Sequence, residues 1–427
     1  MTQSSGGWRT RRPFAAAIAA LAALVLLGAC ATTVPAEKAP AQAAAGSKPA
    51  ASTVVPPPPP VGNLPPPPPP GSGTTAEETR AIPQGEAKIA ALLPLSGPNG
   101  PLGRSILDAV QLAVGDARSG VPVELIARDT AGSPDGAREA ARSAIEAGAN
   151  LVVGPLLGGE VAAVAEIARP AGVPVLSLTN NASSAAPGAH VLGMLPQNQV
   201  ERLVGFATTK GARRFALVAP DDLYGQIIED AFRGAVRAAG GTAAMVERHG
   251  ADMNAISRAV KKVADAVDRI DAVLVAGNGD NLIVSASFVP YYDISAKEKL
   301  VLIATVSWDD QRLRREASLH GAHVAAPINA RREEFLRRYR EAYKREAPLL
   351  ASLGYDATAL AVAAIREGSE TGMLAILTSA SGFEGYDGVF RLEPDGTNRR
   401  LLPVLQFDRG GPKVVEDAPT TFERPAN

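Results

Sequence analysis

The sequence has one cysteine, few aromatic residues and almost no net charge. Of its 427 residues, 4% are aromatic, and the formal net charge is −1. A balance so close to neutral gives no electrostatic basis for nucleic-acid binding, so we expect no nucleic-acid partner. One cysteine, Cys30, excludes an intramolecular disulfide, and the folded core must be stable without one. At 46% hydrophobic residues the chain is long enough for one or two sizeable cores.

Motifs of the common catalytic and metal centres are also missing. We find no H-E-x-x-H, no G-x-S-x-G and no S-x-x-K suited to acyl transfer. His320 and His323 are close in sequence, but no third metal ligand accompanies them. The adjacent acids Asp221 and Asp222 are explained as helix N-caps. We therefore expect a protein that is not an enzyme and that carries no metal or cofactor.

The first 30 residues predict export. Arg9, Arg11 and Arg12 precede a short apolar stretch from Phe14 to Leu27, the order of a secretory signal peptide. The segment Leu27-Gly28-Ala29-Cys30 resembles the lipobox of bacterial lipoproteins, which implies that Cys30 is lipidated and becomes the mature N-terminus. The alternative is a cleaved signal with an incidental cysteine. Ala31 after the cysteine implies, by the same resemblance, a periplasmic protein anchored to the outer membrane.

Residues 31–87 predict a disordered tether. They are rich in Ala and Pro, with proline runs at 56–60 and 65–70 and no recurring apolar positions. Proline runs favour polyproline II at about 3.1 Å per residue, so the tether could span on the order of 100 Å.

The globular part is organised around units like the one from Leu151 to Ser184. A buried apolar run (151–153) precedes a helix with Val161 and Val164 on one face, and a second run (173–176) ends in small polar residues. Similar strand–helix units start at Lys88 and recur to about residue 305. Short loops between such units predict α/β architecture with two doubly wound parallel sheets.

We assign residues to two lobes joined by hinge crossings. Lobe 1 is predicted to comprise 88–198 and 323–380, because the chain is expected to return to it from His323. Lobe 2 is predicted to comprise 199–322 and 381–408, with a closing hairpin of Gly385–Leu392 and Leu401–Phe407, and 409–427 form a disordered tail. Helix Arg331–Arg345 is expected to be a solvated outer helix with pairs such as Glu334/Arg338 and Glu341/Arg345, a basic docking surface being the alternative.

Ligands of open α/β sheets bind at the carboxyl ends of the strands, and pockets form between lobes. The residues predicted to line such a cleft are turn-forming or polar and follow predicted strands. From lobe 1 they are Ser96, Gly97, Leu156, Leu157, Gly158, Ser177, Thr179 and Asn180. From lobe 2 they are Tyr224, Asn278, Asp280, Ser307 and Trp308. Each also has an explanation as an ordinary turn or cap residue.

Several segments resemble one family. Ile89–Gly103 (IAALLPLSGPNGPLG), Val153-Gly154-Pro155, Gly172–Ser177 (GVPVLS) and Tyr224-Gly225 resemble the type I periplasmic binding fold, in particular the branched-chain amino-acid binding proteins. The resemblance implies hinged lobes that close over a ligand. In amino-acid binders, hydroxyls after the third and fourth strands hold the ligand. Ser177 and Thr179 supply the second set, whereas the third-strand loop Leu156–Gly159 has no hydroxyl.

Two functional hypotheses follow. A proline-rich tether and an incomplete amino-acid site resemble the outer-membrane lipoproteins that activate a penicillin-binding protein, so the first partner expected is a peptidoglycan synthase. The alternative is the solute-binding receptor of an ABC importer for branched-chain amino acids or a similar small ligand, which the two-lobed cleft favours.

Overall fold

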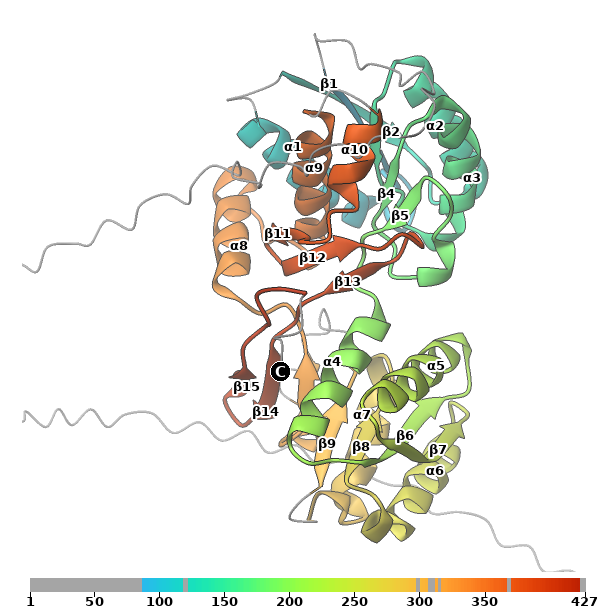
Figure 1. The fold of residues 1–427 in the computed structure, drawn as a ribbon, viewed down its shortest axis with the longest axis vertical. Coiled ribbons are helices and arrows are strands. Elements are labelled where there is room, and N and C mark those ends of the chain that lie inside the picture. Colours follow the sequence, from blue (N-terminus) through green and yellow to red (C-terminus); the bar gives the residue numbers. More distant parts are fainter. Residues whose placement is uncertain are drawn as a thin grey trace, which may run out of the picture. The chain divides into compact units, whose positions relative to one another are not determined.

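The computed structural model describes residues 87–117, 122–296, 300–305, 312–313, 316–366 and 370–422. The predicted signal peptide, Cys30 and the tether up to residue 86 lie outside these residues. All described residues fall in one compact unit. They form two lobes, each built on its own sheet (Figure 1).

Lobe 1 contains a five-stranded sheet of order β2-β1-β3-β4-β5, in which all neighbours are parallel. Its strands are β1 (Ala87–Leu93), β2 (Val123–Asp129), β3 (Leu151–Val153), β4 (Val175–Ser177) and β5 (Ala189–Val191). Along β1, Ile89 and Ala91 face one hydrophobic core while Ala90 and Leu92 face another. A parallel strand buried on both faces needs a continuous apolar run. The predicted doubly wound sheet is confirmed.

Helices cover both faces of this sheet, as Figure 1 shows. One core contains α2 and α3, the opposite core contains α1, α9 and α10, and α8 packs outside against α1 and α9. These helices are α1 (Gly100–Ala117), α2 (Pro134–Glu146), α3 (Gly158–Ala168), α8 (Ala330–Tyr343), α9 (Ala351–Ile365) and α10 (Glu370–Leu377).

Lobe 2 contains a seven-stranded sheet of order β15-β14-β10-β9-β8-β6-β7. Its strands are β6 (Arg214–Pro220), β7 (Thr242–His249), β8 (Ala272–Val275), β9 (Val301–Ala304), β10 (His323–Ala325), β14 (Val404–Asp408) and β15 (Gly411–Glu416). One core contains α4 and α5, and the opposite core contains α6 and α7. These helices are α4 (Pro196–Thr209), α5 (Leu223–Ala238), α6 (Met253–Asp265) and α7 (Gly279–Tyr291). Short 3-10 helices are η1 (Arg169–Ala171), η2 (Ala182–Ser184), η3 (Val267–Arg269), η4 (Ile294–Ala296) and η6 (Ala317–Leu319).

The return to lobe 1 begins later than the predicted residue 323. His323 in β10 pairs with Ile303 of β9 and with Gln406 of β14, both in the lobe 2 sheet. Val324 and Ala325 face the two opposite cores of lobe 2. The prediction that 323 starts a lobe 1 segment is therefore wrong, and α8 is the first element that packs on lobe 1.

The assignment of 381–408 to lobe 2 holds only for its last residues. A three-stranded sheet of β11 (Phe383–Gly385), β12 (Gly388–Leu392) and β13 (Asn398–Arg400) places Phe390 and Leu392 in the lobe 1 core. The predicted hairpin is therefore wrong in its second strand: β12 pairs with β13, and residues 404–408 pair with β10 and β15.

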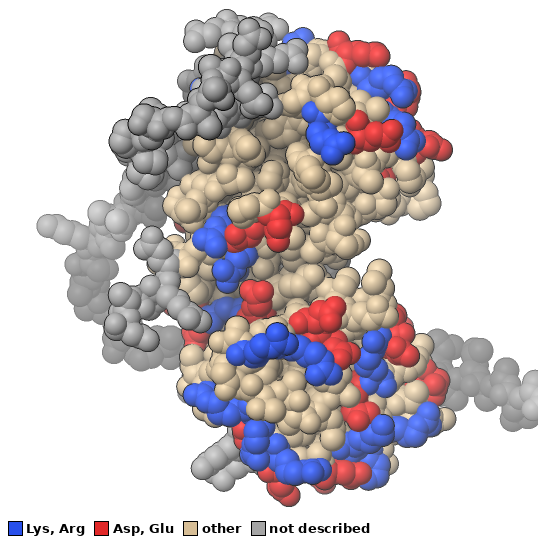
Figure 2. Space-filling model, turned by 45° about the vertical axis from the view of Figure 1, so that its right-hand side comes forward, with Lys and Arg blue, Asp and Glu red and all other residues tan. Residues whose placement is uncertain are grey.

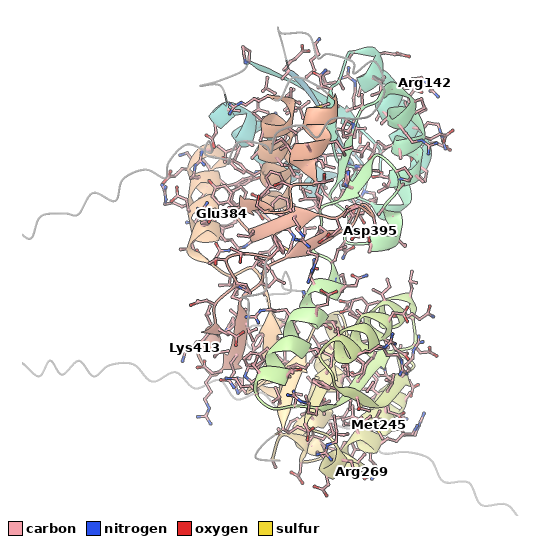
Figure 3. All side chains as sticks on the ribbon, in the orientation of Figure 1. Arg142, Met245, Arg269, Glu384, Asp395 and Lys413 are labelled. Carbon is pink, nitrogen blue, oxygen red and sulfur yellow. The ribbon has the colours of Figure 1, made fainter. Side chains whose placement is uncertain are left out.

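The predicted disordered tail contains the strand β15. It pairs antiparallel with β14, because the turn at Arg409-Gly410 brings Gly411 opposite Asp408. Lys413, labelled in Figure 3, lies on this strand.

The outer helix α8 is anchored more firmly than its sequence predicts. Arg337 pairs along the helix with Glu334 and Glu341. Arg338 instead binds Asp116 of α1 at 2.7 Å, and Arg345 binds Asp108 of α1. The predicted pairs Glu334/Arg338 and Glu341/Arg345 are therefore wrong: the two acids pair with Arg337 along the helix, and the two arginines bind acids of α1. On the face shown in Figure 2, basic and acidic side chains are interspersed.

Candidate ligand-binding site

In lobe 1, the loops after four neighbouring strands are joined to one another at the carboxyl edge of the sheet. The Asp129 Oδ1 atom, at the end of β2, accepts hydrogen bonds from the backbone N–H groups of Leu95 (2.8 Å) and Ser96 (3.3 Å) after β1. The Ser177 hydroxyl, at the end of β4, donates to the Pro155 carbonyl after β3 at 3.1 Å. These bonds bring together the segments predicted to line the lobe 1 side of the cleft.

The loop after β3 depends on two glycines. Gly154 has φ +102°, and a Cβ atom on it would lie 2.1 Å from the Leu92 carbonyl oxygen. A Cβ on Gly158, at the start of α3, would lie 2.9 Å from Ser184 Oγ and 3.1 Å from Thr179 Oγ1. The absence of side chains here lets the start of α3 approach the loop after β4. A helix N-terminus with free N–H groups at such an edge favours anionic groups.

Asp129 and Glu160 are the acidic side chains of these loops. Oδ1 of the exposed Asp129 accepts from three backbone N–H groups, and both oxygens of the buried Glu160 accept hydrogen bonds. Burial tends to raise the pKa of Asp129, but hydrogen bonds from Ser96, Ala131 and Leu95 outweigh it and lower the pKa. Glu160 is buried in the first turn of α3, where it accepts hydrogen bonds from the Thr130 hydroxyl (2.8 Å) and the Leu157 N–H (3.4 Å). Burial raises the pKa of Glu160 despite these bonds.

In lobe 2, Tyr224 connects the loops after β6 and β9. Its hydroxyl donates to the buried Thr305 Oγ1 at 2.9 Å, and burial raises the pKa of Tyr224 to about 12. Asp222 caps α5 by accepting from the Gly225 N–H, which confirms the predicted N-cap. After β8, Asn278 is exposed, and the exposed Asp280 pairs with Arg312 at 2.6 Å.

The predicted site residues divide into three groups. Leu156, Leu157, Gly158, Ser177 and Thr179 lie in the joined loops of lobe 1, with Ser96, Gly97 and Asn180 exposed beside them. Tyr224, Asn278 and Asp280 lie in the loops after β6 and β8 of lobe 2. Ser307 and Trp308 lie outside the described residues. Sequence reasoning missed Asp129, Thr130, Glu160 and Thr305, although Asp129, Thr130 and Thr305 follow strand ends and carried that signal.

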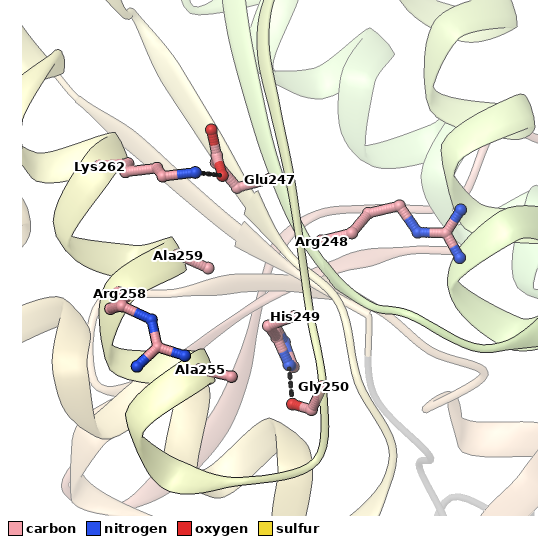
Figure 4. A pocket seen from close by; sticks show the side chains of 8 residues that line it. All are labelled: Glu247, Arg248, His249, Gly250, Ala255, Arg258, Ala259 and Lys262. Carbon is pink, nitrogen blue, oxygen red and sulfur yellow. Dashed lines mark hydrogen bonds and ion pairs between the residues drawn. The ribbon is translucent and has the colours of Figure 1, made fainter.

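A hollow of about 170 Å³ lies between β7 and α6 (Figure 4). Four of its polar side chains are already engaged, among them Arg248, which pairs with Asp221 at 2.9 Å. Lys262 pairs with Glu247 at 2.9 Å, and the His249 ring contacts the Gly250 carbonyl and Ser285. Only Arg258 adds an exposed cation without a described partner, so we place the ligand site at the strand ends instead.

Two classes of feature are not found in the described part of the chain. No helix there is long and apolar enough to cross a bilayer. Within the same residues, no three His, Cys, Asp or Glu side chains are grouped as metal ligands.

Comparison with known proteins identifies the family. A match to the periplasmic binding protein family extends over residues 86–412, most of the chain. The chain belongs to the periplasmic binding protein family. Its family and fold are therefore those of binding proteins, and membership indicates a periplasmic location.

Solved structures of this fold align with nearly the whole of their own length. A putative branched-chain amino acid ABC transporter protein from Rhodospirillum rubrum is 19% identical and covers 77% of this chain and 100% of its own, with a TM-score of 0.69. An ABC transporter solute-binding protein from R. palustris, solved with benzoate, is 18% identical, with a TM-score of 0.54 and coverages of 79% and 98%. At such identities the likeness shows the fold alone.

A curated relative is an uncharacterized protein of Rickettsia prowazekii, 23% identical over 232 residues. The match covers 51% of this chain and 60% of the relative, so the chain spans less than two thirds of the relative's length.

Proposed function

We propose that this chain is the lipid-anchored solute-binding receptor of an ABC importer, and that its ligand is a small carboxylate without an ammonium group. The observation that carries the proposal is the joining of four strand-end loops in lobe 1 of a periplasmic binding protein. Cys30 supplies the anchor and residues 31–87 the tether. Membership of the family and the benzoate-bound relative support this role ahead of the activation of a peptidoglycan synthase.

The hydrogen bonds that Asp129 Oδ1 and Glu160 already accept support a ligand that lacks an ammonium group. An α-amino acid needs an acceptor with free lone pairs for its ammonium group. In the described loops of lobe 1, the oxygen of Asp129 that faces Leu95 and Ser96 also binds Ala131, and Glu160 binds Thr130 and Leu157. Leu156 and Leu157 occupy the third-strand loop, where a hydroxyl is absent. An apolar body with one carboxylate matches these groups better than an amino acid does.

Donors for that carboxylate come from the same loops. Thr179 Oγ1 accepts from the Asn181 N–H at 3.3 Å, and no described residue accepts its hydrogen. We assign this hydrogen to the ligand carboxylate, with the N–H groups at the start of α3. Ser177 has a positioning role, because its hydrogen is donated to Pro155. Tyr224 is assigned to the lobe 2 side of the ligand.

Calorimetric titration of the purified protein with benzoate and with leucine tests the proposal. We expect benzoate to bind and leucine not to bind. Thr179→Val should weaken benzoate binding by about tenfold or more, because a hydrogen bond to a charged group is lost. Thr378→Val is the matched control, since Thr378 is half-buried on lobe 1, where its hydroxyl donates to the Leu374 carbonyl and not to any residue of the site. Binding of leucine would refute the proposed ligand class. If neither benzoate, leucine nor related carboxylic acids bind, the proposal that the protein is a solute receptor would be refuted.

Activation of a peptidoglycan synthase is the second candidate, favoured by the proline runs of the predicted tether. A receptor that docks on an inner-membrane transporter gains little from a tether on the order of 100 Å. Pull-down with peptidoglycan synthases, with and without residues 31–87, distinguishes the two. Capture and stimulation of a synthase by a protein that binds no acid would favour this candidate.

A further inference from the structure

The segment that follows β15 runs from lobe 2 to lobe 1. β15 is hydrogen-bonded to β14 in the lobe 2 sheet. Six residues later, the Phe422 ring lies against Arg391 of β12, with 4.6 Å between the guanidinium carbon and the ring centroid. The same ring packs on the backbone of Gly382, where a Cβ atom would lie 2.6 Å from Phe422 Cε2. β12 belongs to lobe 1, because Phe390 and Leu392 lie in its core.

Arg202 of α4 fixes the beginning of this segment to lobe 2. Its guanidinium pairs with Glu416 at 2.6 Å and donates to the Asp417 carbonyl at 3.2 Å. Its Nε donates to the Leu402 carbonyl at 2.7 Å, in the connection between β13 and β14. The Arg202 side chain is only 15% exposed, so these charge-assisted bonds are partly shielded from water.

In the part of the chain that the structure describes, the backbone connects the two lobes at three other places. These are the connections from β5 to α4, from β10 to α8 and from β13 to β14. We propose that residues 417–422 form a fourth connection, a strap held by Arg202 at one end and by Phe422 at the other, which limits the motion of the lobes. Because its lobe 1 end is held by side-chain contacts, the strap can be released, which the other connections cannot.

The arrangement predicts how release occurs. A fully extended chain spans at most about 3.3–3.6 Å per residue, which limits the distance that the segment between Glu416 and Phe422 can bridge. A lobe rotation that exhausts this slack must withdraw the ring from Arg391 or break the contacts of Arg202. The ring contact is the weaker anchor, because it consists of one cation–π pair and packing on Gly382, whereas Arg202 makes an ion pair and two hydrogen bonds. The strap is thus a latch that opens at Phe422.

Distances between spin labels on the two lobes test this inference without a ligand. Protein expressed from the full chain with Cys30→Ala carries Glu139→Cys on α2 and Asp265→Cys on α6, whose native side chains are 71% and 63% exposed. We expect Phe422→Ala, and a chain that ends at Glu416, to broaden the distance distribution to the same extent. Thr421→Ala is the matched control, because Thr421 is exposed in the same segment.

Circular dichroism establishes that each variant is folded, and Arg391→Gln replaces Phe422→Ala if that variant does not fold. A folded Phe422→Ala protein with an unchanged distribution would overturn the proposal. Broadening by the shortened chain alone would also overturn it, because the ring would then not be the anchor. Equal broadening by both, with Thr421→Ala unchanged, would support it.

Discussion

Removal of the carboxylate of Asp387 should destabilise lobe 1 strongly. Asp387 lies between β11 and β12 with a fully buried side chain, and it pairs with Arg332 of α8, whose side chain is 4% exposed. Ser352 of α9 donates to the second carboxylate oxygen at 2.7 Å. Asp387→Ala removes the carboxylate that pairs with the buried Arg332 guanidinium. Breaking a buried pair in this way costs about 3–5 kcal/mol of unfolding free energy.

Urea unfolding followed by circular dichroism measures this loss as a lower midpoint at unchanged slope. Arg337→Ala on the same helix is the matched control. Arg337 pairs with Glu341 at 2.8 Å, but the two side chains are 54% and 62% exposed, so the midpoint should stay within error of the parent protein. Replacing both partners, as in Arg332→Met with Asp387→Leu, should recover most of the loss.

A loss below about 1 kcal/mol for Asp387→Ala would refute the reasoning, because the pair would then behave as a surface pair. A double variant as unstable as Asp387→Ala would also refute it, since packing and not an uncompensated charge would be the cause.

Three further predictions concern pH and backbone space. Burial, together with the charge of Asp387, raises the pKa of Asp356 to about 7 from its ordinary 3.8. The contribution of Asp356 to stability is therefore fully present below pH 3.8 and is lost as the pH rises through about 7. Urea midpoints measured across that range should show this loss in the parent protein and not in Asp356→Asn. Burial lowers the pKa of His190 below its ordinary 6.5, against the charge of Asp395 in the turn labelled in Figure 3. The contribution of His190 to the free energy of unfolding should therefore fall as the pH drops below 6.5. If the stability of His190→Gln fell with the same slope as that of the parent protein below this pH, the prediction would be contradicted. Gly154→Ala should cost about 2 kcal/mol or more through contact with the Leu92 carbonyl, whereas Gly159→Ala, with open space at its Cβ, is the control in thermal melts.

Local apolar runs were enough to predict both sheets and the helices that cover them. Strands such as Ile89–Leu93 and Ala272–Ala276 are buried on both faces, and that property is visible in the sequence. The predictions of the sheets succeeded because the signal lies within one segment. The structure places Ser177 and Thr179, which the strand-end rule selected for the ligand site, beside the loop after β3; their role in binding stays a prediction.

Predictions that needed a distant partner failed. β10 and β14 are short apolar strands whose sequences do not indicate which sheet they join. The paired residues His323 and Gln406 are 83 positions apart in the sequence. The hydrogen bond from Thr130 to Glu160 and the contact of Arg338 with Asp116 likewise join separate elements. Periodicity reports which face of an element is apolar, but it does not report the surface that covers it.

Buried polar side chains supply that missing information in the last part of the chain. Asn398, 2% exposed in β13, donates to the carbonyls of Val191 and Gly193, both at 2.9 Å. Arg400 donates to the carbonyl of Leu192 at 2.7 Å. Asn398 Oδ1 also accepts from Asn198 Nδ2 in the first turn of α4 at 3.1 Å. Because the donors of Asn398 and Arg400 bind the end of β5 and the residues that follow it, we infer that they favour lobe 1 for β13, where the apolar pattern leaves both lobes open. Asn398→Leu keeps the size and burial but removes the donors, and it should raise amide hydrogen exchange in β13 and in residues 191–193. Arg399→Gln, exposed on the same strand, should leave exchange unchanged; equal exchange in all three proteins would mean that apolar packing alone places this strand.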